Sequence, residues 1–321
     1  MKKWLLLFIL LLLPCGALAR EETTLMLYML GGDLEMDSGA ASADLRELLT
    51  ASLPEGLRAV VLTGGSPAWE LPGVADGAVQ VSEVSQGQIS PLACWEDAAC
   101  ADAGTLELFL REYAPAQGNA VLVFWGHGCK GLEGVGYDLL ADGDTLTVPE
   151  IAGVLAEYPG RISAVGFDAC SMATIETAAL LSPWTDWLIA SPEPEMLSGW
   201  PYRSWVQAYD GDMAAWLAAL REQTVLRWQR ERAGSGLTVL SLRELDAHGD
   251  LLKTLFGKAT GIPGCTLAEL AGGDESLRVE LDAWLNGQTL RTGIFGESLP
   301  GQLQHLPALE DACLRWQQRM R

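Results

Sequence analysis

The fold of this chain is decided by two stretches of its sequence, Val121-Leu-Val-Phe-Trp-Gly-His127-Gly128 and Ile162-Ser-Ala-Val-Gly-Phe-Asp168-Ala-Cys170. Each stretch is an apolar run of strand length that ends abruptly in reactive side chains. Strands that are apolar on both faces are typical of a parallel sheet covered by helices. Because ligands bind at the carboxyl ends of such strands, we expect His127 and Cys170 to lie close together there.

Further segments of strand and helix length alternate on both sides of these two stretches. This alternation predicts an α/β fold with a mostly parallel sheet. Residues 67–91 predict a hairpin or a long loop, and residues 126–147 predict a loop rich in glycine and acidic residues. Other strands are expected at 23–30, 57–62, 187–190 and 236–242, and helices at 40–49, 105–113, 149–157, 172–181, 212–232 and 243–256.

The first nineteen residues have the features of a secretory signal peptide. A basic pair, Lys2-Lys3, precedes an apolar run, and Ala17-Leu-Ala19 has the small residues of a cleavage site. The alternative is a lipoprotein signal that uses Cys15, although the proline before that cysteine argues against it. No later segment has the eighteen or so apolar residues of a membrane span. We therefore expect an exported, soluble protein without a membrane span.

The net charge and the cysteines restrict the classes of function. The formal charge of the chain is −21 at pH 7, which argues against binding to nucleic acid or to anionic membranes. Six cysteines follow the signal segment, and Cys94 and Cys100 have the spacing to close a small disulfide loop in an exported protein. The cysteines are not spaced like a zinc cluster.

The two strand ends carry the groups that a thiol nucleophile requires. A thiolate at Cys170 would attack a peptide carbonyl, and the imidazole of His127 would take up the thiol proton. The tetrahedral oxyanion needs backbone N–H donors. The N–H groups of Gly128 and of Cys170, expected at the start of a helix, are the candidates for this oxyanion hole.

The residues around these positions resemble the clostripain family of cysteine peptidases, which belongs to the caspase-like clan. The resemblance spans roughly residues 23 to 245. It implies a caspase-like three-layer sandwich, which we assign to residues 20–245. The resemblance does not cover the tail, whose short helical pieces predict a C-terminal helical extension packed on the core at 246–321. The matching pieces are Leu27-Tyr-Met-Leu-Gly-Gly-Asp-Leu-Glu35, Trp125-Gly-His-Gly128, Gly166-Phe-Asp-Ala-Cys-Ser-Met-Ala173, Ala190-Ser191 and Gly199-Trp-Pro-Tyr202.

The resemblance also assigns roles to residues of this chain. His127 matches the catalytic histidine and Cys170 the nucleophile, whereas Asp168 matches an acidic residue at the floor of the S1 pocket. Such a carboxylate would pair with a basic P1 side chain, and we expect Arg to be preferred over Lys because a guanidinium can bind in a bidentate manner. Among the tryptophans, Trp200 is the candidate for contact with the substrate. The expected partners are polypeptides with Arg or Lys at P1.

Several interpretations stay open at this point. No cofactor is expected, and no motif supports a calcium site, although some relatives depend on calcium. The protein is expected to be a monomer. Asp168 is also placed to cap the following helix, and Asp33 and Glu35 are equally compatible with lining the site and with structural pairing. The alternatives for the whole chain are a non-catalytic exported binding module and a related thiol peptidase of non-basic specificity.

Overall fold

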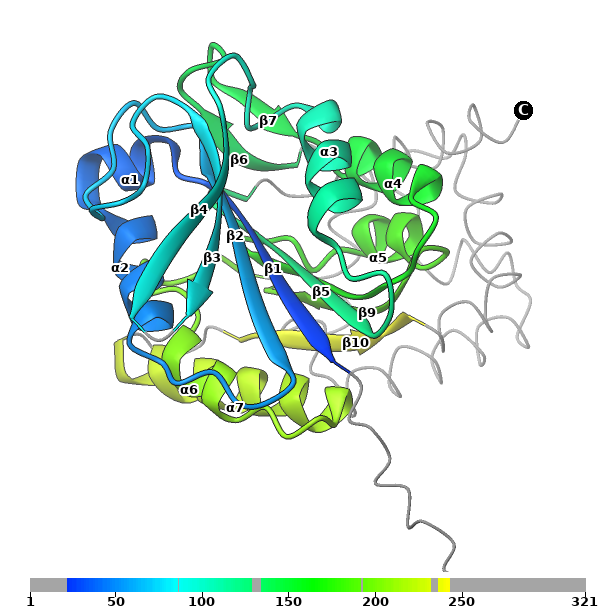
Figure 1. Ribbon diagram of the computed structural model, residues 1–321. Coiled ribbons are helices and arrows are strands. Elements are labelled where there is room, and N and C mark those ends of the chain that lie inside the picture. Colours follow the sequence, from blue (N-terminus) through cyan, green and yellow to red (C-terminus); the bar gives the residue numbers. More distant parts are fainter. Residues whose placement is uncertain (1–21, 86, 129–133, 192, 232–235, 243–321) are drawn as a thin grey trace, which may run out of the picture.

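The computed structural model describes residues 22–85, 87–128, 134–191, 193–231 and 236–242 (Figure 1). The expected signal peptide, the lipoprotein alternative at Cys15, the helix expected at 243–256 and the extension at 246–321 lie outside the described residues. Within the described ranges, every helix is too short or too polar to span a lipid bilayer.

A single eight-stranded sheet forms the centre of the molecule. Its strand order is β10-β9-β8-β5-β1-β2-β3-β4. The five strands β9, β8, β5, β1 and β2 pair in parallel, and the antiparallel pairs lie toward the two edges. The strands are β1 (Thr23–Leu30), β2 (Leu57–Gly64), β3 (Val79–Ser85), β4 (Gln88–Trp95), β5 (Asn119–Trp125), β8 (Ile162–Asp168), β9 (Thr185–Ala190) and β10 (Thr238–Ser241).

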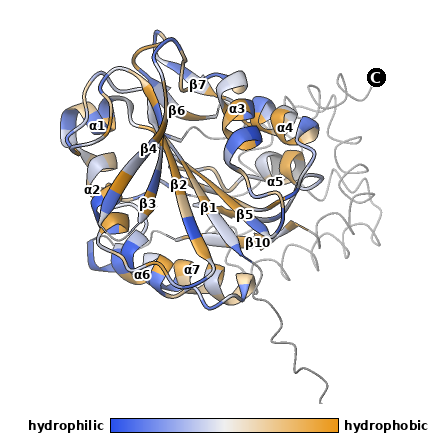
Figure 2. Cartoon of the chain, in the orientation of Figure 1, coloured by the Kyte–Doolittle hydropathy of each residue, from blue (hydrophilic) through white to orange (hydrophobic). Residues whose placement is uncertain are grey.

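Helices cover both faces of this sheet and complete a three-layer sandwich (Figure 1). One face packs against α3 (Ala103–Tyr113), α4 (Val148–Glu157) and α5 (Ile175–Leu181). The other face packs against α2 (Ala40–Leu49), α6 (Tyr202–Gln207) and α7 (Met213–Glu231). These helices carry both hydrophobic and hydrophilic residues (Figure 2), as expected for helices that have one face on a core. The predicted α/β sandwich with a mostly parallel sheet is therefore confirmed.

Two apolar cores fill the spaces between the layers, and they differ in composition. The core under α3, α4 and α5 contains the stacked rings of Phe124 and Phe167. The core under α2, α6 and α7 is rich in tryptophan, and Trp205 stacks on Trp216 with ring centroids 4.7 Å apart. Both cores exclude water from the central strands, so the polar chemistry is confined to the ends of the strands.

The sequence-based expectations missed several short elements. The helices α1 (Gly32–Ser38) and α6 were not expected, and the predicted loop at 126–147 contains a small hairpin of β6 (Val135–Asp138) and β7 (Asp144–Leu146). Elements this short carry little periodicity of their own and depend on tertiary contacts. Thus α1 starts at Gly32, whose positive φ of 50° places it directly against the backbone of Tyr137.

Candidate active site

The first site residue, His127, follows β5 at the carboxyl edge of the sheet. The N–H of Gly126 donates to the carbonyl of Asp168 at 3.3 Å, which ties the end of β5 to the end of β8. The carbonyl of His127 accepts a hydrogen bond of 2.7 Å from the N–H of Gly136 on β6. The backbone of His127 is therefore held on two sides, and its half-exposed side chain lies at the surface of the edge.

The imidazole of His127 has a carboxylate partner that comes from a different element. Nε2 of His127 lies 2.9 Å from Oδ1 of Asp33, in the first turn of α1. A carboxylate only accepts hydrogen bonds, so Nε2 is the donor in this contact and Nδ1 is the ring nitrogen that the contact leaves available. Of the two acidic residues considered there, Asp33 reaches the site. Glu35 is buried instead and accepts bonds from the backbone N–H groups of Ser42 and Glu70.

The second site residue, Cys170, lies in a turn directly after β8. The next residue, Ser171, has a positive φ of 58°, and its N–H donates to the carbonyl of Glu193 at 3.0 Å. The thiol is free and partly exposed, and its Sγ accepts a hydrogen bond of 3.3 Å from the N–H of Glu195. The turn thus presents Cys170 outward at the same edge of the sheet as His127.

This turn corrects two expectations about the helix that follows. The helix was expected from Met172 with Cys170 at its start, but α5 begins only at Ile175 and its N-cap is Thr174. Asp168 is therefore not a helix cap, and Cys170 does not lie at a helix N-terminus. The reason is that the N–H groups of Ser171 and Ala173 donate to the loop after β9, as in the hydrogen bond from Ala173 N–H to the carbonyl of Ser191.

Gly128 brings the two strand ends into direct contact. A Cβ atom built on Gly128 would collide with the carbonyl oxygen of Cys170 and lie 2.7 Å from its amide nitrogen. Only glycine leaves room for this approach. The structure therefore places the backbone of Gly128 against the backbone of Cys170, one residue after His127.

Asp168 is the buried acid of the site. Its Oδ2 atom accepts hydrogen bonds from the phenol of Tyr202 at 2.7 Å and from the backbone N–H of Trp200 at 3.3 Å. Burial raises the pKa of Asp168 above its usual value, although the hydrogen bonds oppose this shift. Trp200 is itself fully buried, and it contacts Asp168 through its backbone. Substrate contact by the Trp200 side chain stays a prediction.

Two further buried carboxyl groups lie near Asp168, and sequence reasoning did not select them. Burial and the charge of Asp168 raise the pKa of both Asp44 and Glu195 well above the usual value. Asp44 accepts a hydrogen bond of 2.8 Å from Nε1 of Trp125. The carboxyl group of Glu195 is buried beside Asp168, and its interaction with that carboxyl group contributes to the raised pKa of Glu195. Glu195 lies in the loop before Gly199, where the family resemblance was a usable signal, whereas nothing in the sequence singles out Asp44.

The arrangement of a free thiol, an imidazole and a buried acid agrees with the match to known families. Residues 27–235 match the model of the clostripain family, and this range contains every site residue described above. The chain belongs to the clostripain family. The clostripain-family assignment makes the chain a cysteine peptidase.

Solved structures support the fold of this clostripain-family chain. A secreted C11 cysteine protease from Bacteroides thetaiotaomicron, in complex with an irreversible peptide inhibitor, has a TM-score of 0.59 and 18% identity, covering 74% of this chain and 70% of that one. An inactive zymogen C11 protease from Parabacteroides distasonis has a TM-score of 0.56 and 18% identity, covering 76% and 68%. No curated protein matches the chain. The caspase-like fold is therefore shared with known C11 proteases.

Besides Cys170, the described part of this clostripain-family chain contains two cysteines, Cys94 and Cys100. Their spacing would allow a small disulfide loop, but both are free thiols. Cys100 is buried, and its backbone N–H donates to the carboxylate of Asp138 at 2.7 Å. In the part of the chain that the structure describes, no three His, Cys, Asp or Glu side chains gather in a way that would hold a metal ion.

Proposed function

We propose that this chain is an exported endopeptidase that cleaves polypeptides after basic residues, Arg before Lys, with Cys170 and His127 as its catalytic pair. The observation that carries the specificity is the burial of Asp168 two residues before the thiol. A buried carboxylate is costly without a counter-charge. A guanidinium or ammonium group at P1 supplies that charge, and the guanidinium binds a carboxylate in a bidentate manner.

The proposed reaction starts with transfer of the Cys170 proton to Nδ1 of His127. The thiolate attacks the scissile carbonyl carbon, an S–C bond forms, and the carbonyl π electrons move to the oxygen. When this tetrahedral intermediate collapses, the C–N bond breaks and His127 gives its proton to the leaving amine. Water, deprotonated by His127, then hydrolyses the thioester and restores the thiol.

The oxyanion is assigned to the backbone N–H groups of Gly128 and Cys170. The close approach of these two residues supports the assignment, because two N–H donors on adjacent backbones can converge on one oxygen. The thiol, the imidazole and these donors supply the whole reaction from the chain itself. We therefore propose that it needs no cofactor and that the enzyme acts as a monomer outside the cytoplasm.

Reporter peptides with a fluorescent leaving group test this proposal. The mature protein, reduced and assayed with and without calcium, is expected to cleave after Arg and more slowly after Lys, but not after citrulline, the neutral counterpart of Arg. Cys170→Ala should abolish turnover. Asp168→Asn should lower kcat/KM for the Arg reporter by about 100-fold, because it removes a charge-assisted bond in a buried site.

The controls separate the alternatives. Glu193→Gln removes a carboxylate from the same loop as Glu195 and should leave kcat/KM within about twofold, as for surface changes in general. Cleavage mainly after neutral residues would identify a thiol peptidase of non-basic specificity. No cleavage of any reporter, together with a Cys170 thiol that does not react with iodoacetamide in the folded protein, would identify a binding module.

A further inference from the structure

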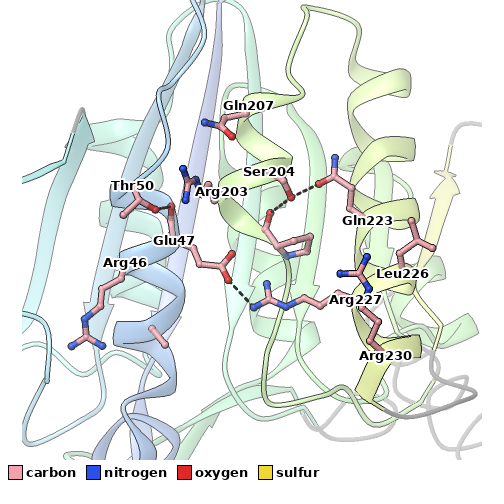
Figure 3. A pocket seen from close by; sticks show the side chains of 12 residues that line it. Arg46, Glu47, Thr50, Arg203, Ser204, Gln207, Gln223, Leu226, Arg227 and Arg230 are labelled. Carbon is pink, nitrogen blue, oxygen red and sulfur yellow. Dashed lines mark hydrogen bonds and ion pairs between the residues drawn. The ribbon is translucent and has the colours of Figure 1, made fainter.

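A groove that is separate from the catalytic edge lies in the helical layer of α2, α6 and α7 (Figure 3). Its volume is about 880 Å³, within the range of roughly 300–1,000 Å³ found for ligand sites. Pro201 lines the groove and directly follows Trp200, whose N–H donates to Asp168, so the groove lies next to the loop that contacts Asp168. The residues that line it include Arg46, Glu47, Pro201, Arg203, Arg227 and Arg230.

The groove concentrates the positive charge of the described chain. The described residues contain eight arginines and no lysine: Arg46, Arg58, Arg111, Arg161, Arg203, Arg221, Arg227 and Arg230. Four of these eight line the groove, and among the described residues that line it Glu47 is the only acidic one. The whole chain, by contrast, carries twice as many acidic as basic residues, with 42 Asp and Glu against 21 Lys and Arg.

The arginines outside the groove all have partners within the described part of the chain. Arg161 bonds to Asp186 at 2.9 Å, and Arg221 bonds to the carbonyl of Leu237 at 3.1 Å. The remaining two pairs are Arg58 with Glu83 and Arg111 with Glu112, both at 3.1 Å.

The groove arginines are only partly neutralised. Arg227 bonds to Glu47 at 2.7 Å, and Arg46 lies 3.7 Å from Glu70. Arg203 and Arg230 are exposed, and neither forms a hydrogen bond or an ion pair with any described residue. The two arginines without such a partner thus lie in the same groove, from two different helices (Figure 3).

We propose that this groove binds an acidic segment, rich in Asp and Glu, of a polypeptide that the peptidase encounters. Guanidinium groups pair with carboxylates through parallel hydrogen bonds. The rest of the protein carries a strong negative charge and repels such a segment, so we expect the segment to bind in the groove. Its position beside Pro201 allows one polypeptide to occupy both the groove and the catalytic edge.

Binding of a fluorescein-labelled hexaglutamate peptide, followed by fluorescence anisotropy, tests the proposal. The Cys170→Ala protein is used so that the peptide is not cut. Hexaglutamate should bind saturably at low ionic strength and more weakly as salt is added, whereas hexaglutamine should not bind. The double variant Arg203→Glu/Arg230→Glu should weaken binding at least about tenfold, since two attractive pairs become repulsive.

The matched control is Arg58→Glu/Arg111→Glu, which changes the net charge equally at exposed positions outside the groove. Retained binding in this control supports the groove, whereas an equal loss would show a general charge effect and overturn the proposal. Binding of inorganic phosphate as tight as that of hexaglutamate would also overturn it, in favour of a small-anion site. The assay needs no turnover, so its failure leaves the proposed cleavage after basic residues untouched.

Discussion

At the scale of single residues, the partner of His127 depends on which carboxylate of helix α1 faces the imidazole ring. Asp33 and Glu35 are two positions apart on α1 and therefore do not face the same way. Glu35 is buried in backbone hydrogen bonds, whereas Asp33 remains half-exposed at His127. We interpret Asp33 as a positioning residue, because its bond to Nε2 fixes both the ring orientation and the tautomer of His127.

Replacing Asp33 by Asn tests this interpretation. The amide keeps the size of the side chain but no longer selects the tautomer with the proton on Nε2. We expect kcat to fall by at least about tenfold, less than the 10²–10⁴-fold typical of losing general acid–base catalysis itself, with KM little changed. Asp37→Asn, an exposed position on the same helix, is the control. An equal kcat for both variants would rule out the positioning role.

At the scale of elements, α7 connects the tryptophan-rich core to the loop of the site. Its Arg227 donates to the carbonyl of Trp200 at 3.2 Å and to Glu47 of α2 at 2.7 Å. The N–H of Trp200 in turn donates to Asp168. The nineteen-residue helix therefore fixes the peptide segment on which the position of the buried acid depends.

The substitution Arg227→Gln should loosen the backbone segment at Trp200, because it weakens the bonds of residue 227 to the Trp200 carbonyl and to Glu47. Because the ion pair with Glu47 is partly buried, we expect a loss of about 1 kcal/mol or more in the free energy of unfolding. We also expect a severalfold rise in KM for the Arg reporter, since Asp168 is held less firmly. Arg230→Gln, on the same helix but without a contact to Trp200, should change neither quantity. Steady-state kinetics measures KM, and urea unfolding measures the free energy of unfolding. Identical KM values in the two variants would contradict the link between Arg227 and the position of Asp168.

At the scale of the whole molecule, the fold gathers three buried acids from separate parts of the chain. Asp44 comes from α2, Asp168 from the end of β8, and Glu195 from the loop after β9. Burial raises the pKa of each one. A raised pKa means that the folded state holds protons more tightly than the unfolded state does. This contribution to stability is therefore fully present below the ordinary pKa and is lost as the pH rises through the folded value.

Asp44→Asn should remove part of this pH dependence. The free energy of unfolding of the wild type should fall relative to the variant as the pH rises from the ordinary Asp value of 3.8 through the raised value. The difference should reach at least about 1 kcal/mol, since one pKa unit corresponds to about 1.4 kcal/mol. The asparagine oxygen can still accept the bond from Trp125 Nε1. Urea unfolding across this range, with Asp37→Asn as the control, measures the effect, and parallel curves would refute it.

Much of the sandwich could be predicted from the sequence because buried strands and helices have recognisable local patterns of apolar residues. Strands β1, β5 and β8 are continuous apolar runs, since both of their faces are covered. Helix α4 follows Thr147, which caps it together with Glu150 in a capping box. The abrupt change from apolar to reactive residues after β5 and β8 also predicted where His127 and Cys170 would lie.

The sequence by itself therefore determined the central strands β1, β5 and β8, their parallel arrangement and the edge at which thiol and imidazole gather. Only the tertiary structure decided which distant side chains join them. Asp33 is 94 positions from His127, and Asp44 is 81 positions from Trp125. The groove likewise takes its arginines from three helices. Hydrophobic periodicity records only whether a residue is buried, whereas its neighbours across the chain are set by the packing of whole elements.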